Sequence, residues 1–483
     1  MPLLDPQFIF EEVSSGIIND VKWNLAPQNS VGNAINVVFD EVIGEAVVRK
    51  GSNLIGSALN GSANAIAGLH YIANSSGSIS RLIAVSNNGS NNAIQYYTGA
   101  TWTNSSITTD TAGARTRFVT FLDYTVRLNG VDTSVTSQDG ISWGTNLALD
   151  DANFPPLAKF GIVYKAQLIF AGCSNRPDSL FISSVPNSSG TAISWTTGNR
   201  EIVINPSDGQ NIRGLGVVGT TLIVFKDRAM YRWNNRTTDA DQVVRVGCSS
   251  QESIVNCGSG LLAFFNPQGI YLTSGDQPIL ISRRIQQWID GMSGSYYSLV
   301  AGYGDENYVY MSLGDCTVKG TTYSNVVARY TVATKEWAVY SYANKFRCFV
   351  VYIDSGTPKI IGGDSTNKVF QIESTSLTDN ETAIGFQLES QEITFGSRGT
   401  IKEISERIIG YGVNPSNCLV QVKVDARDWV TLGGLDKTVK QFSITEPLKG
   451  HYFKFRVIGT SSAARMRFQG LECPNVTVLD YGD

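Results

Sequence analysis

An all-β protein, with a six- or seven-bladed β-propeller between an N-terminal arm and a C-terminal antiparallel β-sandwich, is the architecture that the sequence predicts. The chain has 483 residues, more than the ~250–300 at which a single core stops growing, so several domains are expected. Its 47 glycines, 17% charged residues and 42% hydrophobic residues suit many short strands and turns, and they argue against disorder. The third observation is a short unit of apolar strands that recurs along the chain.

The recurring unit is clearest in residues 209–233, GQNIRGLGVVGTTLIVFKDRAMYRW. Two apolar runs, 215–218 and 221–225, flank a turn at Gly219, and a charged turn then leads into a third run that ends at Trp233. Strands of four to six residues separated by glycine and charged turns are typical of an antiparallel meander.

Variants of this unit fill residues 61–373, and a last copy at 349–372 lacks a tryptophan. Four short strands at a period of about 40–50 residues indicate propeller blades, because a blade buries both faces only against its neighbours in a ring. We therefore expect equivalent blade positions for the six tryptophans, which lie 38 to 55 residues apart: Trp102, Trp143, Trp195, Trp233, Trp288 and Trp337. A large irregular β-sandwich is the alternative.

Three segments lie outside the repeat. Residues 1–60 are predicted to be an arm or docking segment that packs along a neighbouring domain or reaches a partner subunit. Residues 374–384, STSLTDNETAI, lack a strand pattern and are predicted to be a linker. Residues 385–483 contain runs that alternate apolar and polar residues in places, which predicts an antiparallel sandwich with one face of each sheet buried.

No catalytic, cofactor-binding or metal site is predicted. Gly214, Gly216 and Gly219 spell G-x-G-x-x-G, but a β-branched run follows them instead of a helix, so we interpret them as turn glycines. The seven cysteines lack C-x-x-C spacing, and only His70 and His451 could join them as ligands. Reduced, mostly buried thiols are therefore expected in place of a zinc site.

Signatures of glycan enzymes are incomplete. Residues 137–143 nearly match the Asp-box of sialidase-type propellers, which is a structural turn. Asp305 and Glu306 are adjacent in a turn and are expected to be solvated, so they do not predict the carboxylate pair of a glycosidase. Sialidases bind the carboxylate of their substrate with three arginines. The spacing of the arginines in this chain does not single out three among Arg81, Arg115, Arg117, Arg213 and Arg228.

Charge and hydropathy exclude further classes. The net charge of −4 and the absence of a basic run give no reason to expect tight binding of nucleic acid. The N-terminus lacks the basic region and apolar core of a signal peptide, and no window approaches the ~20 apolar residues of a membrane span. The chain is therefore expected to fold in a cytoplasm.

Four segments and the order of the parts carry a resemblance to a known family. The segments are DEVIGEAVVRKGSNLIG at 40–56, the second repeat at 121–140, GLGVVGTTLIVFKDRAMYRW at 214–233, and LKGHYFKFRVIGTSSAARMRFQGLE at 448–472. They resemble the tail nozzle (tail tubular) proteins of short-tailed bacteriophages. The resemblance covers most of the chain, although Lys50 stands where proline is expected.

The resemblance implies a homo-hexameric ring that docks on the head–tail adaptor and conducts genomic DNA out of the capsid. It also implies a platform for tail fibres or spikes, a place in the virion tail after assembly in the host cytoplasm, and no enzymatic activity or cofactor. Duplex DNA would pass through the lumen non-specifically, bound no more tightly than about 10⁻⁴–10⁻⁶ M. The alternative is a propeller that binds or hydrolyses a surface glycan and works as a monomer.

Overall fold

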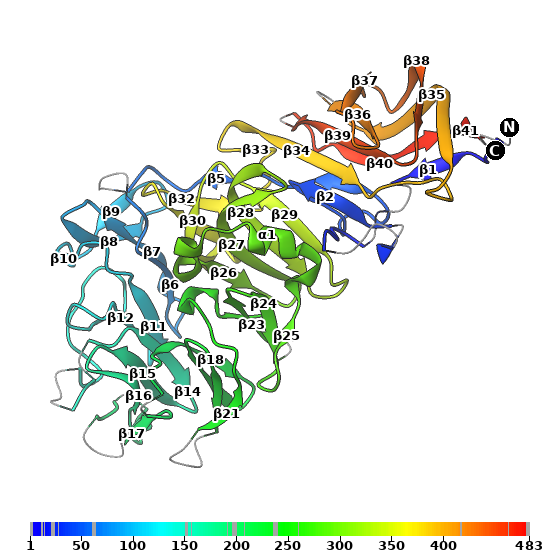
Figure 1. Cartoon of the computed structure of the whole chain (residues 1–483). Coiled ribbons are helices and arrows are strands. Elements are labelled where there is room, and N and C mark those ends of the chain that lie inside the picture. Colours follow the sequence, from blue (N-terminus) through cyan, green and yellow to red (C-terminus); the bar gives the residue numbers. More distant parts are fainter. Residues whose placement is uncertain are drawn as a thin grey trace.

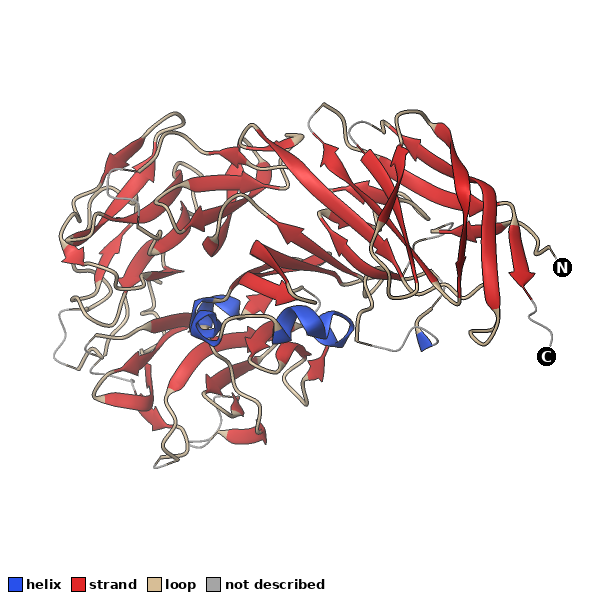
Figure 2. Ribbon diagram, turned by 45° about the horizontal axis from the view of Figure 1, so that its top comes forward, coloured by secondary structure: helices blue, strands red, loops and turns tan. Residues whose placement is uncertain are grey.

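The computed structural model is almost entirely β-structure (Figures 1 and 2). Among the residues that it describes, α1 (Gln286–Asp290) is the only α-helix. Those residues are 3–10, 13, 15–20, 25–27, 29–59, 64–149, 153–155, 157–190, 192–195, 200–206, 208–234, 240–258, 260–415, 418–461 and 463–479.

In this described part, seven antiparallel sheets follow one another along the chain as blades. Blades 1 to 3 contain β6 (Gly68–Ala73), β7 (Ser80–Asn87), β8 (Asn91–Tyr97), β9 (Trp102–Asn104) and β10 (Asp110–Thr111); β11 (Arg117–Phe121), β12 (Tyr124–Leu128) and β13 (Val135–Ser137); and β14 (Phe160–Tyr164), β15 (Gln167–Cys173), β16 (Arg176–Ile182) and β17 (Arg200–Val203).

Each of the remaining four blades has four strands. They are β18 (Ile212–Val218), β19 (Thr221–Lys226), β20 (Met230–Trp233) and β21 (Asp241–Val244); β22 (Val255–Asn256), β23 (Leu262–Asn266), β24 (Gly269–Thr273) and β25 (Ile279–Leu280); β26 (Ala301–Gly304), β27 (Tyr308–Val318), β28 (Thr321–Thr331) and β29 (Trp337–Ser341); and β30 (Phe346–Asp354), β31 (Thr357–Asp364), β32 (Val369–Ile372) and β5 (Asn53–Leu54).

The first strands of the blades form a closed ring. β6, β11, β14, β18, β22, β26 and β30 contact one another in this order, and β30 contacts β6. β5, which precedes blade 1 in the sequence, pairs with β32 and completes blade 7. The predicted all-β propeller is therefore confirmed, with seven blades, and one strand from the N-terminal segment closes its ring.

The six tryptophans do not occupy equivalent positions, so that prediction is wrong. Trp102 and Trp337 begin the fourth strands of their blades, whereas Trp233 ends a third strand. Trp288 lies in α1, and Trp143 lies beyond the end of β13. A tryptophan that recurs in the repeat predicts a large buried side chain in each blade, but that side chain can come from different strands or from a connecting segment.

Three of the tryptophans nevertheless form the same kind of hydrogen bond. Each indole Nε1 donates to a backbone carbonyl in the segment that leaves the preceding blade, which ties neighbouring blades together. The pairs are Trp102 with Ile55 (2.9 Å), Trp195 with Leu147 (3.1 Å) and Trp337 with Ile281 (3.0 Å).

The remaining strands form two sheets that lie together as the sandwich (Figure 1). One sheet contains β1 (Gln7–Ile9), β3 (Val37–Val38), β4 (Ala46–Val48), β35 (Ile401–Val413), β38 (Val439–Gly450), β40 (Arg467–Cys473) and β41 (Val476–Leu479). The other contains β2 (Val31–Ile35), β33 (Thr378–Asp379), β34 (Thr382–Ser390), β36 (Cys418–Val424), β37 (Val430–Gly434) and β39 (Phe453–Ser461).

The N-terminal segment is therefore part of the sandwich and not a separate arm. β1 and β4 pair with β40, and β2 pairs with β34. The physical reason is burial, because every residue of β2, β3 and β4 is buried and a free arm would expose these apolar runs to water. The segment 374–384, expected to be a linker, contains β33 and the start of β34.

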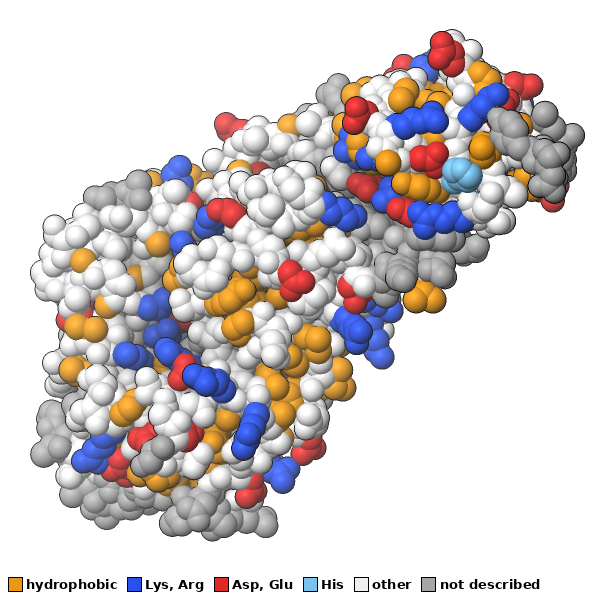
Figure 3. Space-filling view, viewed as in Figure 1, with side chains coloured by type: hydrophobic (Ala, Val, Ile, Leu, Met, Phe, Trp, Pro, Cys, Tyr) orange, Lys and Arg blue, Asp and Glu red, His pale blue; other side chains and the backbone are white. Residues whose placement is uncertain are grey.

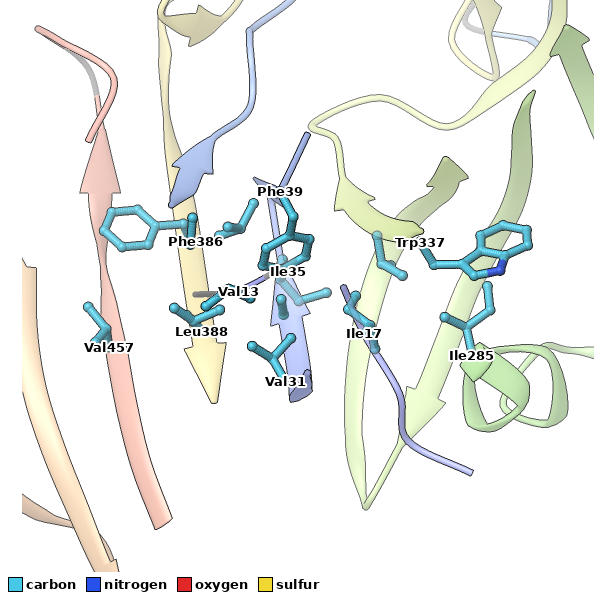
Figure 4. Close-up of a cluster of buried hydrophobic side chains, with 14 of the residues drawn as sticks. Val13, Ile17, Val31, Ile35, Phe39, Ile285, Trp337, Phe386, Leu388 and Val457 are labelled. Carbon is cyan, nitrogen blue, oxygen red and sulfur yellow. The ribbon is translucent and has the colours of Figure 1, made fainter. Parts of the chain in front are cut away.

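One hydrophobic cluster runs from the sandwich into blades 5 and 6 of the propeller. Figure 4 shows the N-terminal residues Val31, Ile35 and Phe39 between Phe386 of β34 and Trp337 of β29. The N-terminal strands therefore pack on both domains, and one continuous hydrophobic cluster joins propeller and sandwich.

The chain crosses between the domains twice, near residues 49–52 and 373–378, and Arg49 joins the two crossings. Its guanidinium is fully buried and forms two hydrogen bonds with the Asp379 carboxylate, of 2.6 and 2.9 Å. Further bonds go to the Asn36 side chain and to the carbonyl oxygens of Lys50 and Ser341. All five N–H donors of the guanidinium therefore have acceptors.

Other residues of the segment 40–56 also lie at this contact between propeller and sandwich, which is called the joint below. Asp40 pairs with Arg329 of β28, and the side chains of both are almost fully buried. A Cβ added to Gly51 would overlap the backbone carbonyl of Thr378, so only glycine lets the two crossings approach this closely.

We predict that Arg49→Met lowers the midpoint of urea unfolding by the equivalent of about 3–5 kcal/mol, because it leaves the Asp379 carboxylate buried without a counter-charge. Lys440→Met is the control: its partner Asp436 is 62% exposed and water screens the pair, so the midpoint should change far less. Arg49→Met/Asp379→Leu should recover part of the loss. Equal shifts of the midpoint for Arg49→Met and Lys440→Met would contradict the proposed contribution of the buried Arg49–Asp379 pair to stability.

Candidate functional site

A cavity of about 360 Å³ lies on the propeller axis. It is lined by residues of the inner strands β6, β11, β14, β22, β26 and β30 and by the 3-10 turn η2 (Gln251–Ser253). Four of its lining positions supply no side chain: Gly68, Gly161, Gly302 and Gly304. Its volume falls within the range of small-molecule sites, about 300–1,000 Å³.

Two arginines and one glutamate meet at this cavity. The Nε atoms of Arg115 and Arg117 lie 3.2 and 2.6 Å from Oε1 of Glu252. Arg115 also donates a hydrogen bond from Nη2 to the carbonyl oxygen of Arg347. Arg117 begins blade 2, Glu252 precedes blade 5, and Arg347 belongs to β30 of blade 7. These contacts therefore cross the axis and connect three blades that are not neighbours in the ring.

The arginines keep the glutamate ionised. Burial alone would raise the pKa of Glu252, but the charges of Arg115 and Arg117 outweigh it and lower this pKa to about 2. Burial lowers the pKa of Arg117, and Glu252 acts in the opposite direction. At neutral pH the three side chains together carry one net positive charge.

Arg347 adds a third guanidinium beside this cluster. Its Nε and Nη1 atoms are buried, and neither has a hydrogen-bond partner in the described part of the chain. Its Cζ atom lies 4.9 Å from the centroid of the Tyr296 ring. The nearby Asp315 carboxylate is paired with Lys345 at 2.6 Å. In Figure 3, Lys and Arg side chains gather on the face of the propeller where Figure 1 places β6 and β11.

The turn η2 is held against β18, the strand that contains two of the three glycines of the G-x-G-x-x-G motif. The packing of these glycines differs from the interpretation given above. The Gln251 side chain accepts from the backbone N–H of Leu215 and donates to its carbonyl, at 2.7 and 3.1 Å. Gly214 and Gly216 lie inside β18, where a Cβ would meet Ile254 or Leu262, so they are packing glycines and not turn glycines. Gly219 is the turn glycine, with a φ of 55°.

The other motifs have structural partners. In the Asp-box-like segment, Asp139 accepts hydrogen bonds from the backbone N–H groups of Ile141 and Ser142, which forms the expected turn. Asp305 is not merely solvated, because its carboxylate accepts the Tyr303 hydroxyl at 2.8 Å as well as two backbone N–H groups. Glu306 is exposed.

The two histidines lie apart. Burial lowers the pKa of His70 to about 4, and its Nε2 lies 2.9 Å from the Thr120 hydroxyl. His451 is exposed, with its Nδ1 3.1 Å from the Arg398 carbonyl oxygen.

All seven cysteines fall within the described ranges, are buried and form no disulfide, which confirms the expected buried thiols. No group of three or more His, Cys, Asp and Glu is placed to hold a metal ion among the described residues. Within the same residues, no helix has the length and apolar character needed to cross a membrane.

The lining of the cavity offers one carboxylate and two guanidinium groups. Glycosidases of the usual kinds use two carboxyl groups, and Glu252 is the single carboxylate among the lining residues that the structure describes. Its ionised state and its two arginine partners leave it no proton to donate near neutral pH. The spacing of Arg115 and Arg117 was the available sequence signal, because residues two apart in an extended segment point to one face, although β11 itself begins only at Arg117. Glu252 and Arg347 carried no such signal.

Comparisons with known proteins concern the fold. No family model and no curated protein matches the chain. Solved structures that resemble it include YCF48 bound to D1 peptide (11% identity, 65% of this chain and 93% of that chain, TM-score 0.41) and the Neurospora crassa Pan2 WD40 domain (6%, 67% and 96%, 0.40). An ancestral GH74 enzyme is also similar (9%, 80% and 55%, 0.40). At such identities the likeness is one of fold and says nothing of function.

We predict that Gly216→Ala destabilises the propeller by about 1–3 kcal/mol, because the new Cβ would lie 2.6 Å from Cδ1 of Leu262. The matched control is Gly385→Ala, also within a strand, where no atom lies within 4 Å of the added Cβ. Calorimetry with NAD and ATP should show no binding to the unmodified protein. Specific nucleotide binding would contradict a purely structural role for these glycines.

We predict that Glu252 makes stability depend on pH. Because its folded pKa of about 2 lies below the ordinary 4.5, its contribution is present above pH 4.5 and is lost as the pH falls toward 2. The full shift corresponds to about 3 kcal/mol. Thermal midpoints between pH 5 and 2 should therefore fall less steeply for Glu252→Gln than for the unmodified protein, whereas the exposed control Glu306→Gln should leave the slope unchanged. Identical slopes for all three proteins would refute this role of Glu252.

Proposed function

We propose that this chain is a non-enzymatic structural subunit of a ring-forming tail nozzle of a short-tailed bacteriophage. The observation that carries the proposal is the position of the residues on which the resemblance depends. In the segment 40–56, Asp40, Arg49 and Gly51 form the joint between propeller and sandwich. These residues are thus tied to the particular way in which the two domains are combined, and not only to a generic blade.

The segments 214–233 and 448–472 support the same assignment. The first forms β18, β19 and β20, against which η2 is fixed at the propeller axis. The second contains β39, which pairs with both β34 and β36 inside its sheet. The sequence features that resemble nozzle proteins therefore lie in one blade of the propeller, inside a sheet of the sandwich and at the contact between the two domains.

The size of the axial cavity bears on where DNA would pass. A space of about 360 Å³ suits a small molecule, and the contacts of Arg115 and Arg117 with Glu252 cross it. A duplex therefore cannot use the propeller axis as its path. In the proposed function the lumen lies between copies of the chain, so a closed ring of subunits, which we propose to be a hexamer, is a requirement for conducting DNA.

The proposed partners follow from this role. The ring would dock on the head–tail adaptor, support tail fibres or spikes, and let duplex DNA pass without specific contacts in the virion tail. Assembly would take place in the host cytoplasm. A monomeric propeller that binds a glycan is the second candidate, and the cationic axial cavity is the observation that favours it.

We predict that electron microscopy of the purified full-length chain, alone and with a head–tail adaptor ring, shows closed six-fold rings with a continuous lumen between subunits. In the same preparations, fluorescence anisotropy should give a dissociation constant for duplex DNA no tighter than about 10⁻⁶ M at physiological salt. A chain that stays monomeric under both conditions would overturn the nozzle proposal and favour the glycan-binding alternative. Sub-micromolar, sequence-selective DNA binding would indicate a different role.

A further inference from the structure

We infer that the axial cavity of the propeller binds a small oxyanion, a carboxylate or phosphate group carried by a molecule no larger than a monosaccharide. Two guanidinium groups, those of Arg115 and Arg117, line the cavity with one carboxylate, that of Glu252, and Arg347 lies beside it, directly before the lining residue Cys348. This inference concerns the isolated chain and does not depend on the proposed nozzle function.

The balance of charge at the cavity is the first argument. Glu252 neutralises one of the three arginines, and its second carboxylate oxygen accepts the Ser250 hydroxyl at 2.8 Å. The Asp315 carboxylate is already paired with Lys345, and the Asp305 carboxylate accepts the hydroxyl of the lining residue Tyr303. Among the described residues no other carboxylate forms an ion pair with these three arginines, so two of their positive charges lack an anion at contact distance, and charge buried without a partner is costly.

The second argument is the fixed orientation of the arginines. Arg117 holds its Nε toward Glu252, and its Cζ lies 4.9 Å from the centroid of the Phe160 ring. Its Nη1 and Nη2 atoms make no hydrogen bond to another described residue. Arg347 rests against the Tyr296 ring and leaves Nε and Nη1 without acceptors. A planar guanidinium held in this way presents paired donors that match the oxygens of a carboxylate or phosphate.

The third argument is space and dielectric environment. Glycines at four lining positions keep side chains out of a cavity of about 360 Å³, which suits a monosaccharide or a phosphate ion. The side chains of Arg115, Arg117 and Glu252 are only 14–19% exposed, so bound charge would be poorly screened by water and its attraction to the arginines correspondingly strong.

A purely structural brace across the axis would need fewer groups. One arginine per carboxylate would link blades 2 and 5, and the backbone carbonyl of Arg347, which Arg115 uses, could come from any residue type. The side chain of Arg347 and the terminal nitrogens of Arg117 contribute nothing to that brace. An anionic ligand would explain why Arg117 faces the cavity and why Arg347 stands directly before the lining residue Cys348.

The test is isothermal titration calorimetry on the full-length protein in low-salt buffer, with inorganic phosphate, glucuronate and glucose as separate ligands. Glucuronate and glucose differ only in the carboxylate, so binding of glucuronate without glucose shows that the anionic group is recognised. Saturable binding of phosphate alone would identify a phosphate-bearing ligand, and binding of glucuronate alone would identify an acidic sugar. Absence of binding by both anions at 10 mM, roughly the weakest affinity that a useful site would have, would overturn the inference.

Variants locate the site. Arg347→Gln should weaken anion binding about tenfold or more while leaving the Glu252 contacts intact, and circular dichroism should confirm an unchanged fold. Arg117→Lys keeps the charge but loses the planar fork, and it should weaken binding as well. The matched control is Arg213→Gln, at an exposed arginine on the same propeller that pairs with Asp227.

The Arg213→Gln control distinguishes binding at the axial cavity from non-specific association of the anion with surface arginines. Binding that survives Arg347→Gln and Arg117→Lys, or that falls equally with Arg213→Gln, would show an adventitious ion only and would refute the inference. Ring formation by Arg347→Gln should be unaffected, so failure of the anion site and failure of the nozzle proposal are distinguishable.

Discussion

The buried contact between Arg49 and Asp379 is the constraint on which the arrangement of the two domains depends. A guanidinium taken fully out of water is tolerated only when its donors are all satisfied, and here the five acceptors come from the N-terminal segment, the end of β29 and β33. Any shift of the sandwich against blade 6 would break several of these bonds together. The pair therefore fixes the relative position of the two domains.

The same chain segment also determines how the propeller closes. After Arg49 the backbone passes Gly51 and enters β5, which pairs with β32 and completes blade 7. Closure of the ring and attachment of the sandwich are thus made by consecutive residues. Loosening the joint would also loosen the seventh blade, which connects the stability of the ring to that of the contact with the sandwich.

Local patterns in the sequence predicted most of the fold and little of the site. The apolar runs of all seven blades were recognisable because antiparallel strands joined by short turns are neighbours in sequence. β5 has two residues, too few for a pattern, and the pairing of β1 with β40 spans more than 400 positions, so neither could be predicted. Glu252 and Arg347 likewise reach Arg115 only through closure of the ring. The spacing of the tryptophans indicated that large side chains are buried at regular intervals, but not on which strand of a blade each of them lies.

The architecture restricts how copies of this chain could contact one another. In the propeller every inner strand is enclosed by its neighbours, so free strand edges lie on the outer strands and on the sandwich, where β38 is a twelve-residue edge strand. That edge carries Lys440, Glu446, Pro447 and Lys449, and charges and proline are the features that discourage pairing of one edge with another. Pairing of β38 with a strand of another copy is therefore disfavoured, and a contact between copies at this edge would be made by side chains.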